Sequence, residues 1–299
     1  MVKKILHKIM RSFFFLIALV FAVFCLLPVV LTFVNSFMST PEINANYGAV
    51  FESLSGGSWS SGPPVFMTKT PNLKFIPDMV SIQQYTTVLF QSPDYLLKFW
   101  NSMMYTGVIV IFQIVIGSLA SYSFARYRRK RREMIFFAYI ILMLMPFQVT
   151  LVPNYLISQS LGTYNTPWAI IYPGIFATFS VFLLTKYMRQ IPSSYIEAAK
   201  LDGAGEWQIF TRIAIPMCKS ALYAMAILLF VDYWNMVEQP LWLLKNADLH
   251  PLSVFLSEIN KGEVGIAFAA SFIFMVPPLL LFLHGEQYLV EGISRSGLK

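Results

Sequence analysis

Long apolar runs separated by short polar segments dominate the pattern of this chain. A helix needs about 20 mostly apolar residues to cross a bilayer, because the hydrocarbon core is about 30 Å thick and each helical residue rises about 1.5 Å. Each sufficiently long run predicts a transmembrane helix, and the six predicted spans are residues 13–34, 99–124, 134–152, 167–188, 217–239 and 264–288. The pattern therefore predicts an all-α polytopic membrane protein in which residues 1–299 form a single transmembrane domain.

The composition agrees with this interpretation. Hydrophobic residues make up 57% of the 299 positions and charged residues only 12%. A soluble domain would carry far more charge on its surface, so that class is excluded. Cys25 and Cys218 lie in or beside apolar runs and predict neither a disulfide framework nor a metal site.

Basic residues set the expected orientation. Lys and Arg are retained on the cytoplasmic side of a membrane, and most of the 22 such residues share one side when both termini are placed inside. The basic run "RYRRKRRE", at 126–133, then lies in a cytoplasmic turn, so topology explains it without nucleic acid. Four basic residues before the first apolar run are also compatible with a signal peptide. That run exceeds the usual 7 to 15 residues, and we therefore expect an uncleaved span.

The segment between the fourth and fifth predicted spans is unusual because it is charged and rich in small residues. It reads "EAAKLDGAGEWQIFTRIAIP" from Glu197 to Pro216, and we expect a cytoplasmic helix, a turn and a second helix over 193–216. Ser194 and Glu197 have the S-x-x-E spacing of a capping box. Gly203 and Gly205 are expected to end the first helix.

Two further features of this segment bear on its partners. Asp202 is available to cap the second helix. Ala199 and Gly203 are four residues apart, so we expect them to share a helix face that has almost no side chain on it. Such a face permits close approach by another protein.

These residues carry a resemblance to the membrane subunits of bacterial ABC importers. The signature of that family is EAA, three residues, Gly, nine residues, Ile, one residue, Leu and Pro. This chain matches it at Glu197, Ala198, Ala199, Gly203, Ile213 and Pro216, with Ile215 in place of Leu. Similarity to the carbohydrate-uptake permeases of maltose type extends over 99–299, through "FWNSMMYT", "SYSFARYR", "LMLMPFQVTLVPNYLI", "FVDYWN" and "YLVEGISRSGLK".

The resemblance implies an ABC type I importer permease fold and a location in the bacterial plasma (inner) membrane. It also implies that the motif forms a coupling helix, which docks on a separate cytoplasmic ATPase. The residues expected to couple are Glu197, Ala198, Ala199, Asp202, Gly203 and Trp207. The alternative is an ordinary amphipathic helix that binds lipid headgroups.

The chain is not expected to be an enzyme or to bind ATP itself. No G-x-x-x-x-G-K-[ST] loop, H-E-x-x-H or G-x-S-x-G occurs, and the three histidines are dispersed. We therefore expect no catalytic residue, metal or cofactor in this chain, with ATP and Mg bound by a partner ATPase dimer. The resemblance further implies a second homologous permease in a heterodimer, rather than a homodimer, and an extracytoplasmic solute-binding protein.

Two segments are expected outside the membrane. The loop at 35–98 is long enough to be functional, and its "SGGSWSSGPP" stretch is flexible by composition. Receptor contact and a spacer or lid role stay open for this loop. The resemblance suggests that the loop at 240–262 reaches toward the binding protein.

Polar groups within the predicted spans are candidates for the substrate pathway. Asp232 interrupts an apolar run, and an ionisable group at such a position usually faces a bundle interior or a water-filled cavity. The candidate pathway residues are Asp232, Tyr233, Asn235, Asn101, Tyr105 and Gln113. Tyr233, Trp234, Trp100 and Trp242 could stack on sugar rings. The alternative, which we favour, is an interfacial aromatic belt, because Trp100, Trp168 and Trp242 all fall at the external ends of predicted spans.

These observations together predict the permease subunit of an ABC importer for carbohydrate, with oligosaccharide as the expected class. Import of another solute, such as polyamine, phosphate or phosphonate, is the main alternative. A membrane-embedded structural or enzymatic subunit is the alternative from another class.

Overall fold

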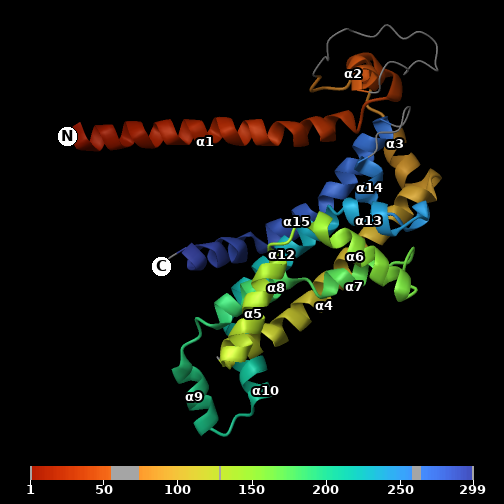
Figure 1. Cartoon of the computed structure of the whole chain (residues 1–299). Helices are drawn as coiled ribbons and strands as arrows, with labels where there is room; N and C mark the ends of the chain where they lie inside the picture. Colours follow the sequence, from red (N-terminus) through yellow and green to blue (C-terminus); the bar gives the residue numbers. More distant parts are fainter. Residues whose placement is uncertain (1, 55–73, 128, 258–263, 298–299) are drawn as a thin grey trace. The chain divides into compact units, whose positions relative to one another are not determined.

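The computed structural model describes residues 2–54, 74–127, 129–257 and 264–297. Within these ranges the regular elements are helices. One isolated antiparallel β-bridge also pairs Met38 with Val80. In chain order they are α1 (Val2–Asn35), α2 (Thr40–Leu54), α3 (Gln83–Thr86), η1 (Thr87–Gln91), α4 (Pro93–Arg126), α5 (Lys130–Met143), α6 (Phe147–Ser160), α7 (Trp168–Ile175), α8 (Thr178–Met188), α9 (Ser193–Leu201), α10 (Glu206–Ile209), η2 (Phe210–Ala214), α11 (Ile215–Met217), α12 (Lys219–Trp234), α13 (Glu238–Leu243), η3 (Ala247–Leu249), α14 (Leu252–Ser257) and α15 (Val264–Gly297) (Figure 1). The predicted all-α fold is confirmed.

The chain forms two compact units. The first comprises 1–96 and 258–274, and the second comprises 97–257 and 275–299. In the first unit, Met38, Ile43, Tyr47 and Val264 make a small buried core. The most apolar stretch of α1 has no buried residue, so this helix presents its apolar surface on all sides.

The second unit holds the larger core, which packs α4, α7, α8 and α12 together. Its most buried members include Ile109 of α4, Ile170 of α7, Leu184 of α8 and Met225 of α12. Gly174 allows the close approach of α7 to α4, because a Cβ there would lie 2.8 Å from Cδ1 of Ile109. This core supports both regions discussed below.

The described residues contain four helices that are long and apolar enough to cross a membrane. They are Met10–Asn35, Pro93–Arg126, Trp168–Met188 and Val264–Tyr288. Two bent pairs raise the number to six if each pair is one span: Lys130–Met143 with Gln148–Ser160, bent by 104°, and Glu206–Met217 with Lys219–Trp234, bent by 73°. The chain is therefore a multi-pass membrane protein, and the count of six spans stays a prediction.

Three predicted spans are not continuous helices, and one of them, at 167–188, is divided into α7 and α8. The apolar run at 134–152 is divided where α5 ends at Met143 and α6 begins at Phe147. Pro146 lies at that break, and proline both lacks an N–H and disfavours helical geometry in the residue before it. The run at 217–239 is also interrupted, since α12 ends at Trp234 and α13 begins only at Glu238.

The predicted loop at 35–98 contains helical structure. Residues Thr40–Leu54 form α2, and α3 and η1 follow later in the segment. Tyr47 donates a hydrogen bond to Oδ1 of Asn35 at 3.3 Å, and Gln84 donates to the carbonyl oxygen of Met38 at 2.9 Å. The stretch "SGGSWSSGPP" lies outside the described residues.

Candidate functional site

The segment that carries the EAA signature forms a helical hairpin, which we define as residues 193–209, from the start of α9 to the end of α10. Figure 1 shows α9 and α10 joined by a turn at one end of the second unit. The predicted capping box at its start is wrong. Extended Pro192 precedes Ser193, and no side chain caps the helix, so Ser194 and Glu197 both lie inside α9.

Gly203 ends α9 in a Schellman motif. The N–H of Ala204 donates to the carbonyl of Ala199 at 2.9 Å, and the N–H of Gly203 donates to the carbonyl of Lys200 at 3.1 Å. Gly203 has φ of +82°, a left-handed conformation that glycine adopts without strain. It therefore forms the turn, and the expected bare helix face shared with Ala199 is not present.

The second helix starts at Gly205, which is its N-cap residue, so the predicted capping by Asp202 is wrong. The side chain of Gln208 accepts a hydrogen bond from the N–H of Gly205 at 3.1 Å. A glutamine three residues after the cap makes the reciprocal bond of a capping box. This local pairing fixes the direction in which α10 leaves the turn.

The hairpin brings together every residue predicted to couple. Ala199 is half-buried, and the others are exposed: Glu197, Ala198, Asp202, Gly203 and Trp207. Trp207 is 67% exposed and Leu201 is 90% exposed, so two apolar side chains stand in solvent beside the turn. The sequence analysis missed Leu201. A leucine beside a predicted turn, here at Asp202 and Gly203, can be recognised in the sequence as a candidate for an exposed apolar side chain.

Glu206 ties the hairpin to the end of α4. Its carboxylate accepts a hydrogen bond from the Tyr122 hydroxyl at 2.7 Å and another from the Lys200 ammonium at 2.6 Å. The bond from Lys200, followed by that from Tyr122, holds the pKa of the Glu206 carboxyl below its ordinary value, against the opposing effect of burial. Glu206 was not among the predicted site residues, because its partner in α4 is distant in sequence.

Apolar packing supports the same junction. Met188, Phe210, Ala214 and Cys218 form a buried cluster between α8 and the start of the fifth predicted span. The ring of Tyr122 lies 5.2 Å from that of Phe210, measured between centroids. The segment that follows the hairpin is therefore packed against the ends of α4 and α8.

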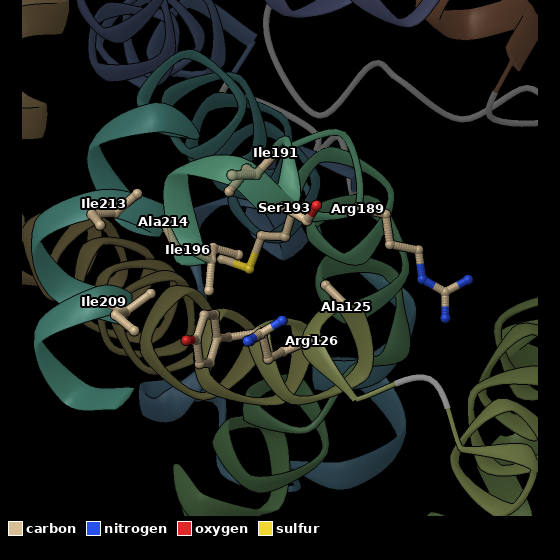
Figure 2. A pocket seen from close by; sticks show the side chains of 11 residues that line it. Ala125, Arg126, Arg189, Ile191, Ser193, Ile196, Ile209, Ile213 and Ala214 are labelled. Atoms are coloured by element: carbon tan, nitrogen blue, oxygen red, sulfur yellow. The ribbon is translucent and has the colours of Figure 1, made fainter. Parts of the chain in front are cut away.

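A cavity of about 420 Å³ lies beneath the hairpin (Figure 2). Its walls come from the ends of α4 and α8, from α9 and from the segment α10–η2. Ile191, Ile196, Ile209 and Ile213 supply most of its apolar surface, and Arg126 enters it from α4. We call this space the hairpin cavity.

A second cavity, of about 970 Å³, contains the strongest predicted pathway residues. Asp232, Tyr233 and Asn235 line it, together with Glu238 and Gln239. The opposite wall comes from α5, α6 and the junction of α7 with α8. We call this space the polar cavity, and its described lining includes two carboxylates and no Lys, Arg or His.

The two carboxylates of the polar cavity differ in their partners. Asp232 accepts no hydrogen bond from the part of the chain that the structure describes. Glu238 accepts one from the Gln148 side chain at 3.1 Å. The sequence analysis did not predict Glu238 as a site residue, because the predicted span at 217–239 was expected to continue through it as one helix. In the structure α12 ends at Trp234.

The three weaker pathway candidates lie elsewhere. Asn101 donates to the carbonyl of Asp248 at 2.7 Å, and Tyr105 donates to that of Leu249 at 2.8 Å, so both anchor η3. Gln113 is fully buried and donates to the Tyr233 hydroxyl at 3.1 Å, which places it behind the cavity wall. None of the three lines the polar cavity.

The tryptophans assigned to the interfacial belt are exposed, and the belt itself stays a prediction. Trp100 is 59% exposed and Trp242 is 61% exposed, whereas Trp234 is fully buried against Phe230 and Phe99. Trp234 therefore has no free face for a sugar ring. Among the described residues, no group of three or more His, Cys, Asp or Glu side chains could hold a metal ion.

Comparison with solved structures shows the fold. The chain superimposes on a chain of a bacterial ABC transporter involved in the import of the acidic polysaccharide alginate, with a TM-score of 0.73 and 21% identity. The match covers 94% of this chain and 96% of that one. This agreement confirms the expected importer permease architecture.

Comparison with known sequences identifies relatives over most of the chain. It is 29% identical to the arabinooligosaccharides transport system permease protein AraQ of Halalkalibacterium halodurans, over 76% of this chain and 82% of that protein. It is 30% identical to the melibiose/raffinose/stachyose import permease protein MelC of Bacillus subtilis, over 68% and 75% respectively. Residues 113–291, which include the hairpin and both cavities, match the binding-protein-dependent transport system inner membrane component. The chain belongs to this family of transporter permeases.

Proposed function

We propose that this chain is a permease subunit of an ABC importer for carbohydrate, with oligosaccharide as the substrate class. The observation that carries the proposal is the hairpin that bears the EAA signature. Its tip is exposed, with Leu201 and Trp207 in solvent, while Glu206 fastens its base to the end of α4. An element of this kind can pass movement from a docked protein to membrane helices.

The carbohydrate assignment has support from the relatives. AraQ and MelC are named for arabino-oligosaccharides and for melibiose, raffinose and stachyose. A further relative, at 29% identity over 69% of this chain, is the lactose transport system permease protein LacG of Rhizobium radiobacter. Three relatives that are named for saccharides favour a saccharide over a polyamine, phosphate or phosphonate.

The negative charge of the polar cavity narrows the class of saccharide that it could accept. Its described lining includes Asp232 and Glu238 and no basic side chain. An anionic sugar would meet repulsion there, while a neutral or cationic sugar would not. We therefore propose a neutral or cationic oligosaccharide, in contrast to the acidic alginate of the solved transporter.

The proposal requires partners. We propose that a cytoplasmic ATPase dimer, which binds ATP and Mg, docks on the hairpin and that a second homologous permease completes the pathway. An extracytoplasmic solute-binding protein would deliver the sugar. The solved transporter is also known in complex with an alginate pentasaccharide-bound periplasmic protein, which supports such an arrangement.

The proposed location is the bacterial plasma (inner) membrane, with both termini and the hairpin in the cytoplasm. The basic run at 126–133, which joins α4 to α5, and the hairpin region both carry Lys and Arg, as the retention of basic residues on the cytoplasmic side requires. Cysteine accessibility to a membrane-impermeant reagent tests this. Ala198→Cys should be labelled only in inside-out vesicles, and Trp242→Cys only in right-side-out vesicles.

Reconstitution tests the function. The chain alone in proteoliposomes should hydrolyse no ATP and accumulate no sugar, and adding the ATPase, second permease and binding protein should produce both activities. Uptake would be compared for neutral, cationic and anionic oligosaccharides and for a polyamine and a phosphonate. ATP hydrolysis by the isolated chain, or uptake of polyamine or phosphonate in preference to every saccharide, would overturn the proposal.

A further inference from the structure

The hairpin cavity combines apolar walls with one cationic side chain. Arg126 is the last residue of α4, and its Nε atom is buried and makes no hydrogen bond to any described residue. The same side chain has no ion-pair partner within the described chain. Figure 2 shows it among the residues that line the cavity.

The other charged side chains around the cavity have charged or polar partners, although Nε of Arg189 is also buried without a hydrogen bond. Arg189 lies at the rim, and its guanidinium donates to Glu133 at 2.6 Å. Figure 2 shows the Arg189 side chain directed away from the other residues of the lining. Glu206 is bound by Tyr122 and Lys200. Arg126 is thus a positive charge that no neighbouring carboxylate neutralises.

A partly buried guanidinium without a partner is costly, and an anion that enters the cavity would remove that cost. Arginine binds phosphate well, because its planar fork donates two parallel hydrogen bonds. Ser193, the first residue of α9, lines the same cavity, so the positive end of that helix dipole adds to the field of Arg126. Arg126 and this helix end both favour a phosphate group.

The position of the cavity indicates where the phosphate comes from. Arg126 and Met188 both line it, and they are the last residues of the candidate spans Pro93–Arg126 and Trp168–Met188. The cavity therefore lies at the level where a bilayer meets water. Basic pockets at the cytoplasmic ends of membrane helices bind anionic lipid headgroups, and the isoleucine walls suit the apolar part of a lipid next to its phosphate.

We propose that the hairpin cavity binds the phosphate of an anionic phospholipid, held by Arg126. The lipid would connect α4 to the start of α9 and so stabilise the hairpin against the membrane helices. Anionic lipid would then be needed for full coupling. The cytoplasmic placement of the cavity, and the effect on coupling, rest on the proposed function.

Native mass spectrometry of the assembled importer tests the binding. Wild type, Arg126→Gln and the control Arg131→Gln would be purified and titrated with phosphatidylglycerol or phosphatidylcholine. Arg131 is an exposed residue of α5 in the same basic run and does not line the cavity, so the control makes the same charge change outside it. We expect Arg126→Gln to weaken retention of phosphatidylglycerol about tenfold or more, a loss appropriate to charge-assisted hydrogen bonds, and Arg131→Gln to match wild type.

Two further variants keep the positive charge at position 126. Ile196→Trp fills the cavity from α9 and should also weaken binding of phosphatidylglycerol, while Arg126→Lys should retain part of it. These variants keep the test decisive if Arg126→Gln does not assemble. Inorganic phosphate is a separate arm, and displacement of all bound lipid by millimolar phosphate would overturn the assignment to a lipid.

A functional readout separates this inference from the proposed function. In nanodiscs of rising phosphatidylglycerol content, substrate-stimulated ATP hydrolysis should rise for wild type and stay flat for Arg126→Gln. Equal lipid retention by wild type and Arg126→Gln would overturn the inference even with transport intact. Absence of saccharide transport with lipid retention intact would overturn the proposed function and leave the lipid site standing.

Discussion

The hairpin and the polar cavity use polar side chains in opposite ways. In the hairpin, Glu206 has two donors within 2.7 Å, and Gly203 and Gly205 complete the backbone bonds of the turn. In the polar cavity, Asp232 has no described hydrogen-bond partner and faces an open volume of about 970 Å³. The turn of the hairpin and its junction with α4 are internally satisfied, whereas the polar cavity presents unused hydrogen-bonding capacity.

This difference matches two kinds of task. A part that transmits movement must keep its own shape, so its polar groups bond to one another. A part that meets a passing solute must leave its polar groups free, because those groups pair with the solute in place of water. Substitutions should therefore change coupling in the hairpin and selectivity in the cavity, and the following predictions test that division.

The largest effect is expected at Glu206. Glu206→Leu removes the acceptor for both Tyr122 and Lys200 and leaves a part-buried hydroxyl without its partner. The bond from Tyr122 to a charged group contributes about 1.5–3 kcal/mol and the exposed pair with Lys200 at most about 1 kcal/mol, so we expect substrate-stimulated ATP hydrolysis by the full complex to fall about tenfold or more. Binding-protein contact and membrane insertion should persist.

Tyr122→Phe is the matched test, because it removes one of the two bonds and no charge. It should produce a smaller loss, and the double variant should be no worse than Glu206→Leu alone. Strictly additive losses would show that Tyr122 and Glu206 act independently, contrary to the observed contact.

The lowered pKa of Glu206 gives this contact a pH dependence. A carboxyl whose pKa is lowered by folding stabilises the folded state at pH values above its ordinary pKa, which is 4.5. This contribution is lost as the pH falls through the lowered pKa. Hydrogen exchange of the hairpin amides, corrected for the intrinsic effect of pH, should therefore increase below that value. Glu206→Gln should remove this pH dependence.

The second effect concerns the turn. Gly203→Ser places a side chain at φ of +82°, which costs about 1–2 kcal/mol. Gly205→Ser makes the same change two residues later, at φ of −73° and at an N-cap position where serine is favoured. A Cβ at either position would meet no atom within 4 Å, so backbone conformation alone separates the two variants.

Hydrogen exchange over 197–207 measures the outcome. Opening of the turn should become about tenfold more frequent in Gly203→Ser and stay near the wild-type level in Gly205→Ser. Equal exchange in the two variants would mean that the left-handed turn is not the reason for glycine at position 203.

These two regions also differ in how far the sequence predicted them. The hairpin was predicted as a helix, a turn and a helix, because Gly203, Gly205 and the signature are local features. Its caps were assigned wrongly, since the helix starts two residues earlier than expected and Ser194 therefore lies inside it. The contact of Glu206 with Tyr122 joins positions 84 residues apart and has no local signal.

The polar cavity was less predictable. Asp232 was identified because an ionisable group in an apolar run is unusual. The remaining lining depends on breaks in two helices, after Met143 and after Trp234, which a long apolar run conceals. Asn101, Tyr105 and Gln113 are polar residues of a predicted span, but their hydrogen bonds go to backbone or to Tyr233, and only the packed structure reveals this.

The third effect is expected in the cavity. Asp232→Asn keeps the size of the side chain and removes its charge, so it should raise transport of anionic saccharides relative to cationic ones. A change of about 1 kcal/mol, appropriate to one solvated charge near a ligand, corresponds to about a fivefold change in that ratio. Asp248→Asn is the control, since Asp248 is exposed on η3 and does not line the cavity. An unchanged ratio in Asp232→Asn would remove Asp232 from the pathway.

The smallest effect on folding, and the most specific test of coupling, is expected at Glu197. Its side chain is exposed and α9 has no side-chain cap, so Glu197→Gln should change stability by less than about 0.5 kcal/mol. Any loss of ATPase co-purification must then come from the missing charge at the docking surface, because there is no capping bond to lose. Glu286→Gln, at an exposed position of α15, is the control and should co-purify normally. If Glu197→Gln retains ATPase at wild-type levels in low salt, where charge pairs are strongest, docking depends instead on the apolar tip formed by Leu201 and Trp207.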